Sequence, residues 1–280
     1  MRRAAVLLLG VCLLWPTPKA SATEHAPVGW ASTGSGTDGG AGGRTWTVDT
    51  RAELKAALAN DGDPTAPKVI RVVGDISGHE ADDGSLLGEQ DYAPGYDLGK
   101  YMSCFGEDGS DLVTVSDSRF DDHDKALLIG SGDGRGERDR GHLKVTFARN
   151  LFSGIVQRAP RVRFGQVHVV NNVHRGRAPL YALGVGVESA IFSERNVFRC
   201  PGGRPSAVVA DYGGERFRDT GSWFNGRPAR LNDVASGLGL GSDVGWDPAD
   251  VYDYRALTSP AAVERYVLRH AGAGRPYGRP

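Results

Sequence analysis

The sequence predicts an all-β fold, a parallel β-helix, because an internal repeat and a marked excess of glycine occur together. A short strand-like phrase that ends near a polar residue occurs four times between residues 113 and 198. Aligned on Ser118, Asn150, Asn172 and Asn196, the copies are 32, 22 and 24 residues apart. Strands that recur at such a period are typical of a coil in which each turn packs on the next. We expect the three asparagines to form a stacked hydrogen-bonding ladder inside the turns.

Glycine supports the same prediction, since it accounts for 40 of the 280 residues, about twice the usual share of roughly 7%. Such an excess favours many tight turns. A β-sandwich is the competing fold, but it needs turn signals every ~8–12 residues and two-residue hairpins. These signals are scarce in this sequence, so the parallel β-helix is preferred.

The first 22 residues have the pattern of an export signal: Arg2 and Arg3, an apolar run over residues 4–15, and the small residues of Ala20-Ser21-Ala22. The run is shorter than the roughly 20 apolar residues that span a bilayer. We therefore interpret residues 1–22 as a signal peptide and residues 23–280 as one domain. The protein is expected to be secreted and extracellular, with no membrane partner.

The remaining elements follow from local signals. Residues 45–49 alternate like a strand, Thr50 and Glu53 form a capping-box signature for a helix that ends near residue 60, and residues 68–73 are rich in β-branched side chains. Residues 97–102 fit a single helical turn.

Two elements are predicted near the C-terminus. Residues 223–226 fit a strand and a turn. Ser259 and Pro260 open a helix that ends at Gly272 and carries Val263, Tyr266 and Val267 on one apolar face. The sequence thus predicts short helices at both ends of the domain.

Charge and cysteine content narrow the class of partner. Loss of Arg2, Arg3 and Lys19 with the signal peptide changes the formal net charge from -1 to -4, which argues against nucleic acid. Any anion binding must therefore be local. Cys104 and Cys200 remain, and the residues leave open whether they form a disulfide in an oxidising exterior or stay free.

A local cluster of cations is the clearest functional signal. Lys125 follows three acidic residues and a histidine in residues 121–124, and Arg158 and Arg163 flank Pro160 in residues 157–165. Pro160 restricts its own backbone and that of the residue before it. Arginine matches planar carboxylates in a bidentate manner and lysine adds a point charge. The cluster therefore favours a polymer that carries regularly spaced carboxylates.

The segment after Pro160 indicates how these side chains are presented. If it forms a strand, Arg161 and Arg163 share one face while Val162 and Phe164 point to the other. A basic stripe then lies beside an apolar one. We interpret Arg161 as structural.

Several ordered segments resemble the bacterial pectate lyases of polysaccharide lyase family one. They are residues 116–130, 158–165 and the pair Asn171-Asn172, preceded by residues 39–43 and 67–74, which resemble the family's opening rung. Residues 152–198, including the segment 184–189, resemble the actinobacterial branch of the family. The resemblance covers most of the chain after residue 22.

This resemblance implies a right-handed parallel β-helix that acts as a monomer on polygalacturonate or pectin, cleaving it by β-elimination with the help of calcium. It assigns Arg158 as the Brønsted base and Lys125 and Arg163 as ligands of substrate carboxylates. The proton removed lies α to a uronate carboxylate, so cations at that carboxylate stabilise the enolate-like transition state. Arginine is almost always protonated, and neighbouring cations would have to favour its neutral form.

The chain departs from the family before Leu112, where several rungs are missing. These rungs carry the family's acidic calcium ligands, and Phe105 occupies the position at which the last of them is expected. Calcium is expected from the family, but its usual ligands are not found in this chain. Glu107, Asp108 and Asp111 are nearby substitutes, which we interpret as ordinary solvated acids.

Alternative interpretations exist for each site residue. Lys125 could pair with Asp121, Asp122 or Asp124 on the surface, and Arg158 and Arg163 could pair with glutamates of a neighbouring rung. His123 is interpreted as a buried or capping histidine rather than a base.

Two functional hypotheses follow. The first is a pectate lyase. The alternative is a catalytically impaired β-helix protein that binds acidic polysaccharide without a calcium site, or an internally deleted chain that folds poorly.

Overall fold

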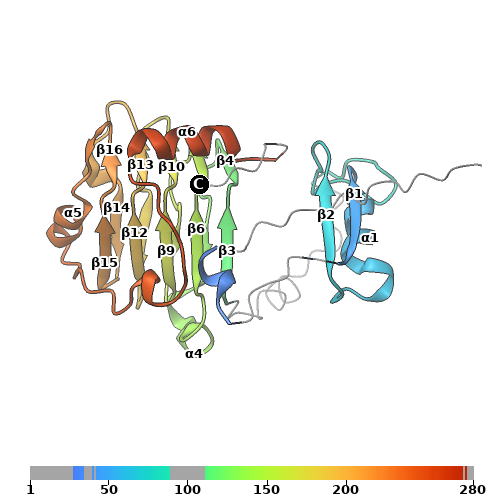
Figure 1. Cartoon of the computed structure of the whole chain (residues 1–280), viewed down its shortest axis with the longest axis horizontal. Helices are drawn as coiled ribbons and strands as arrows, with labels where there is room; N and C mark the ends of the chain where they lie inside the picture. Colours follow the sequence, from blue (N-terminus) through green and yellow to red (C-terminus); the bar gives the residue numbers. More distant parts are fainter. Residues whose placement is uncertain (1–27, 35–39, 41, 89–110, 274, 276–280) are drawn as a thin grey trace, which may run out of the picture.

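The strands of the main body are stacked as three sheets, and each of the first four turns of the coil supplies one strand to each sheet (Figure 1). The structure is a computed structural model that describes residues 28–34, 40, 42–88, 111–273 and 275. Within the three sheets, pairing is parallel except for the final β16–β17 pair. The predicted right-handed parallel β-helix is confirmed.

The last turn adds one strand to the first sheet, two to the second and none to the third. The first sheet consists of β3 (Val113–Ser116), β6 (Val145–Ala148), β9 (Gln166–Val170), β12 (Ala190–Glu194) and β15 (Arg216–Thr220). The second consists of β4 (Arg119–Asp121), β7 (Leu151–Ser153), β10 (Val173–Arg175), β13 (Val197–Arg199), β16 (Trp223–Phe224) and β17 (Arg227–Pro228). The third consists of β5 (Leu128–Ile129), β8 (Arg161–Val162), β11 (Leu183–Gly186) and β14 (Val209–Tyr212).

Short helices lie outside the sheets. The α-helices are α1 (Arg51–Ala59), α4 (Gly136–Asp139), α5 (Leu231–Gly237) and α6 (Pro260–His270). The 3₁₀ turns are η1 (Gly29–Ser32), η2 (Asn60–Gly62), η4 (Asp133–Arg135), η5 (Pro205–Ala207) and η6 (Pro248–Asp250).

A small N-terminal unit precedes the stack. Strands β1 (Arg44–Val48) and β2 (Lys68–Val72) are parallel and are connected through α1. Thr50 accepts a hydrogen bond from the Glu53 amide and Glu53 accepts one from the Asp49 amide, which confirms the predicted start of the helix. Asn60, with a φ of 48°, ends it in the left-handed region. Figure 1 shows this unit apart from the stack.

The core is a column of apolar side chains that point into the coil from each rung. Val145 and Phe147 of β6 are aligned with Val167 and Val169 of β9, and all four are buried. Residues of β8, β11, β12, β13 and β15 continue the same cluster: Val162, Leu183, Val185, Ile191, Phe198 and Phe217. Because each rung covers the apolar side chains of its neighbour, the core depends on the number of rungs.

The corner between the first and second sheets repeats in every rung. Each first-sheet strand is followed by one residue with a left-handed backbone, and then by the ladder residue. The Asn150 amide donates to Oδ1 of Asn172 at 2.9 Å, and the Asn172 amide donates to Oδ1 of Asn196 at 2.9 Å. Ser118 and Ser222 continue the ladder at its two ends. The asparagine ladder predicted from the repeat is confirmed.

Helix α6 covers the second sheet, and its start and apolar face are as predicted. The Ser259 hydroxyl accepts a hydrogen bond from the Ala262 amide. Val263 and Val267 are buried against the sheet. A bidentate pair between Arg199 and Glu264, with both distances 2.6 Å, ties the helix to β13. The predicted strand at residues 223–226 corresponds to β16 and the turn that follows.

Some sequence-based expectations fall outside the described residues. These are the signal peptide at residues 1–22, the helical turn at 97–102, and Cys104. Cys200 is buried and free. In the described part of the chain, no helix has both the length and the apolar character needed to cross a membrane.

The ladder generates a stability prediction. Asn172 is fully buried and its side chain also donates to the Phe147 carbonyl at 2.9 Å. Asn172→Ala leaves several buried polar groups without partners, so we expect it to lower the free energy of unfolding by about 3 kcal/mol. Asn225→Ala, at the last rung, removes two hydrogen bonds between an exposed side chain and the Cys200 backbone. It should lower the free energy of unfolding by less, because water can replace the lost bonds. Urea unfolding measures both, and equal losses would contradict a buried cooperative ladder.

Candidate functional site

The predicted cationic residues lie on the third sheet and on the loops that enter it. Lys125 pairs with Gln157 in a parallel bridge, one rung apart. The Ala126 and Leu127 amides donate to the carbonyls of Gln157 and Arg158, at 3.2 and 2.7 Å. Lys125 and Arg158 are therefore held on adjacent loops by backbone pairing. Adjacent parallel strands lie roughly 4.8 Å apart, so the backbones of these two residues lie close together on adjacent rungs.

The loop that carries Arg158 is fixed to the next rung. The Ala159 amide donates to the Ala182 carbonyl at 2.7 Å, and the Gly184 amide donates to the Pro160 carbonyl at 3.0 Å. Arg158 has a φ of 62°, and the Ala159–Pro160 peptide is cis. In the described residues, Nε of Arg158 is buried without a hydrogen-bond partner.

Strand β8 presents its side chains as the alternation predicts. Val162 is buried in the core cluster, whereas Arg161 and Arg163 lie on the outer face. Phe164 is also buried, but it lies beyond the strand with a φ of 57°, and its ring centre is 5.5 Å from the guanidinium carbon of Arg140, so the alternation does not extend to it. Nζ of Lys125 and the Arg163 guanidinium are each paired with an acid, Asp124 and Asp133 respectively. Arg163 also donates to the Gly130 carbonyl at 3.1 Å.

Arg161 has surroundings that the sequence did not indicate. Its guanidinium carbon lies 4.0 Å from the centre of the Tyr212 ring, and its Nε is buried without a partner among the described residues. Glycines occupy the outward positions of β11. A Cβ at Gly184 would lie 2.8 Å from Cε2 of Tyr181 and 3.0 Å from Cγ of Arg161, and one at Gly186 would lie 2.5 Å from the Val162 carbonyl oxygen and 3.0 Å from Cγ of Arg163. The glycines therefore permit the close packing of β8 on β11, the two arginine side chains included.

Lys125 and His123 are both exposed. The interpretation of His123 as buried or capping is wrong, because its side chain lies on an outer loop whose backbone carbonyl accepts from the Val156 amide. Lys125 forms the surface ion pair with Asp124, at 2.9 Å, that was the alternative to a binding role. Its ammonium group holds the pKa of Asp124 below the ordinary value. Exposed pairs of this kind are weak, so a substrate carboxylate can compete for the lysine.

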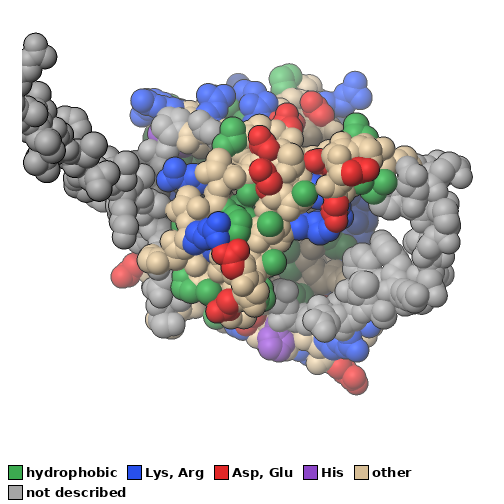
Figure 2. All heavy atoms as spheres, turned by 90° about the vertical axis from the view of Figure 1, so that its right-hand side faces the viewer, with side chains coloured by type: hydrophobic (Ala, Val, Ile, Leu, Met, Phe, Trp, Pro, Cys, Tyr) green, Lys and Arg blue, Asp and Glu red, His purple; other side chains and the backbone are tan. Residues whose placement is uncertain are grey.

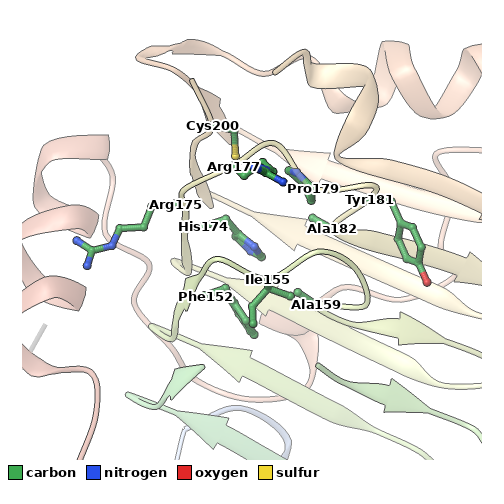
Figure 3. A pocket seen from close by; sticks show the side chains of 10 residues that line it. All are labelled: Phe152, Ile155, Ala159, His174, Arg175, Arg177, Pro179, Tyr181, Ala182 and Cys200. Atoms are coloured by element: carbon green, nitrogen blue, oxygen red, sulfur yellow. The ribbon is translucent and has the colours of Figure 1, made fainter. Parts of the chain in front are cut away.

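A small cavity lies behind the Arg158 loop (Figure 3). Its volume of about 10 Å³ leaves room for one water molecule at most. His174 is stacked between Phe152 and Phe198, with ring centres 4.7 and 4.6 Å away. Burial lowers the pKa of His174 to about 3 and raises that of Cys200 to about 11. The cavity is therefore part of the core and not a substrate pocket.

The acidic residues described near the site do not form a calcium site. Of the three candidate substitutes, Glu107 and Asp108 lie outside the described residues. Asp111 accepts from the Lys144 amide at 2.8 Å and pairs with its ammonium at 2.7 Å. No group of three or more potential metal ligands occurs in the ranges that the structure describes. The donor set that calcium requires, several free oxygens, is not met by these residues.

Together these features define a parallel β-helix protein with a row of cations along one outer sheet. Residues 104–276 match the model of a family described as pectate lyase. Pectate lyase E of Dickeya dadantii (strain 3937) is 30% identical over 380 residues, covering 97% of this chain and 92% of the relative. This chain belongs to the pectate lyase family. That alignment is longer than the 280 residues of this chain, so the relative carries residues that this chain lacks.

Solved structures agree on the fold. The pectate lyase of Acidovorax avenae subsp citrulli superposes with a TM-score of 0.75 at 20% identity, covering 98% of this chain and all of that chain. A pectate lyase bound to a hexasaccharide gives a TM-score of 0.71 at 23% identity, covering 92% and 99%.

Sequence reasoning missed two features of the site. The partnership of Arg161 with Tyr212 was not predicted, because Tyr212 lies two rungs further along the chain and no local pattern connects them. The outward glycines had a signal, since Gly184 and Gly186 alternate within a strand. Gly-x-Gly in a strand of this kind indicates close approach by a neighbouring group.

His174 generates a prediction about acid stability. The folded protein keeps this imidazole neutral down to about pH 3, whereas the unfolded chain binds a proton below about pH 6.5. Its contribution to stability is fully present above pH 6.5 and is lost as the pH falls toward 3. His174→Phe keeps the aromatic stack and removes this loss. Between pH 7.5 and pH 4, the variant should lose about 3 kcal/mol less unfolding free energy than the parent protein.

Urea unfolding at a series of pH values measures this difference. The exposed His142, replaced by Phe in the same way, is the control. If the free energy of unfolding had the same pH dependence in the parent protein and in His174→Phe, protonation of the buried imidazole would cost no stability, which contradicts the lowered pKa of His174.

Proposed function

We propose that this chain cleaves polygalacturonate by β-elimination, with Arg158 as the base and Lys125 and Arg163 as ligands of uronate carboxylates. One observation carries the proposal: Arg158 is fixed by backbone pairing next to Lys125 and its Nε has no partner in the described residues. Family membership supplies the reaction class, because the relatives named above are pectate lyases.

The chemistry follows from the position of the proton. Neutral Arg158 takes the proton from C5 of a uronate, next to its carboxylate carbon. The electron pair forms the C4–C5 double bond as the C4–O4 bond breaks, and the departing O4 takes up a proton. Negative charge develops on the carboxylate during proton removal, so nearby cations lower the barrier. Lys125 and Arg163 are proposed to supply this charge.

The substrate class follows from the same row of side chains. The overall charge of the chain is slightly negative, so anion binding depends on the local row along β8 and the adjacent loop. Arg163 is held by Asp133, an exposed carboxylate on η4, and a substrate carboxylate would replace it. An acidic polysaccharide, with one carboxylate per sugar, suits a row of this kind better than an isolated anion does.

Location and assembly are part of the proposal. A polymer of this size is degraded outside the cell, which agrees with the export pattern in residues 1–22. We propose a secreted monomer that acts on pectin, with no nucleic acid or membrane partner. No step is assigned to calcium, because the described residues do not supply its ligands.

The alternative function is binding without cleavage, which family membership does not favour, because the relatives are named as lyases. A protein that only binds acidic polysaccharide would retain pectate affinity and produce no unsaturated product. Assays with and without added calcium separate this function from the lyase.

Replacement of Arg158 tests the proposed base. Arg158→Ala should lower kcat on polygalacturonate by at least about 100-fold, since a positioned base contributes roughly 10²–10⁴, while affinity for the polymer changes less. Ultraviolet absorbance of the unsaturated uronide measures turnover. Arg175→Ala is the matched control, because Figure 3 shows Arg175 pointing away from the core on another sheet. Undiminished turnover in Arg158→Ala would remove Arg158 as the base, and no turnover by the parent protein would leave binding alone.

A further inference from the structure

The first rung of the stack is incompletely covered. Strands β3, β4 and β5 are the terminal strands of their sheets, and no other strand in the described residues pairs with their outer edges. Val113 is 37% exposed and Leu128 is 42% exposed, whereas Val145, one rung further, is 4% exposed. At the opposite end, α5 covers the last rung with the buried Leu231 and Ala235. Native proteins normally cover an open sheet edge of this kind.

The N-terminal unit has a complementary open edge. Helix α1 covers part of this unit, and Val48 of β1 and Ala57 of α1 are both buried. Figure 2 looks at this end of the molecule and shows acidic, basic and hydrophobic side chains intermingled, as on an ordinary solvated surface. Strand β2, in contrast, has no partner on its second side among the described residues, and Val72 and Val73 are 47% and 57% exposed.

The two edges match in backbone pattern. Gly74 follows β2 by one residue and has a φ of 84°, and Asp117, directly after β3, has a φ of 50°. The Val73 amide donates to the Val48 carbonyl at 2.8 Å and so extends the β1–β2 pairing by one residue, after which Gly74 takes the left-handed position that directly follows each first-sheet strand of the stack. Aligning Gly74 with Asp117 puts Ile70 beside Val113. By the same register, Val72 lies beside Val115.

These positions belong to the core column. Val113 and Val115 are paired with Val145 and Phe147 of β6, which point into the stack. Val72 shares its side of the sheet with Val48, the residue that α1 buries. Strand β2 therefore carries its apolar side chains at the positions that a first-sheet strand requires.

We propose that β2 pairs directly with β3, in parallel, as a sixth strand of the first sheet. The β1–α1–β2 unit then caps the open rung and buries its apolar side chains. Figure 1 shows β2 between β1 and the stack, with its arrow in the same direction as that of β3.

The connection between the strands permits this pairing. Forty residues lie between the end of β2 and the start of β3, whereas 17 residues separate β6 from β9 and 19 separate β9 from β12. The chain therefore has more than enough length for one turn of the coil. Because the unit is tethered, its effective concentration at the edge of its own stack is on the order of millimolar. This favours the unit of the same chain over that of a second copy.

A pair of engineered cysteines tests the register. Val73→Cys and Ser116→Cys occupy adjacent outward positions in the proposed pairing, within the distance that a disulfide requires. The background replaces Cys12 and Cys104 by Ser, and it keeps Cys200, whose thiol is buried. We expect most of the oxidised monomer to contain an intrachain disulfide, detected by mass and by non-reducing electrophoresis. The pair Val73→Cys and Ser206→Cys, with Ser206 near the other end of the stack, is the control and should not cross-link.

Two outcomes would overturn the proposal. A disulfide-linked dimer would show that a second copy occupies the edge. Absence of any disulfide, while both thiols react with a soluble reagent in the folded protein, would show that β2 and β3 are not neighbours.

Thermal unfolding provides an independent readout without cysteines. Val72→Asp places a charge in the proposed buried column and should lower the midpoint of unfolding of the stack by about 5 °C. Arg71→Asp, on the opposite face of the same strand, should change it little. Equal midpoints for the two variants would contradict the pairing.

Discussion

Parallel pairing of each strand with its equivalent one turn later is the constraint on which the rest of the structure depends. It aligns Val145 with Val167 and Phe147 with Val169, and so builds the core from one repeated position. The same register aligns the left-handed corners, and this brings the Asn150 amide to the side chain of Asn172. The apolar core, the left-handed corners and the asparagine ladder therefore all follow from the same strand register. A slip of one residue would lose all three.

The same constraint creates the candidate site. Backbone pairing between rungs sets Lys125 beside Arg158, although 33 positions separate them in the sequence, and strand alternation directs Arg161 and Arg163 away from the core. Like charges at this spacing repel each other, and the neighbouring groups offset this only in part. Asp133 pairs with Arg163 and the Tyr212 ring contacts Arg161, while Nε of Arg158 has no partner among the described residues. The positive charge of this surface is therefore only partly neutralised within the described residues.

Much of this arrangement could be predicted from the sequence, for physical reasons that also explain the exceptions. The ladder was predictable because its residues recur at one position of a repeat, and the faces of β8 because side chains alternate along a strand. The position of His123 was not predictable, since burial in a loop depends on what covers it. The contact between Arg161 and Tyr212 depends on register across two rungs, and local patterns do not specify it. The roles of Arg158, Lys125 and Arg163 stay predictions from the family resemblance, which also indicates that the family's usual metal ligands are not found in this chain.

We propose that the cation row on the third sheet binds uronate carboxylates through Lys125 and Arg163, with Arg158 as the base on the adjacent loop. The most direct measurement is the NMR signal of the arginine Nε–H groups during titration with trigalacturonate. We expect the Arg163 signal to shift as a uronate carboxylate replaces Asp133, while the signal of Arg199, already paired with Glu264, stays in place. An unchanged Arg163 signal at saturating trigalacturonate, with shifts confined to arginines of the other sheets, would contradict this binding mode.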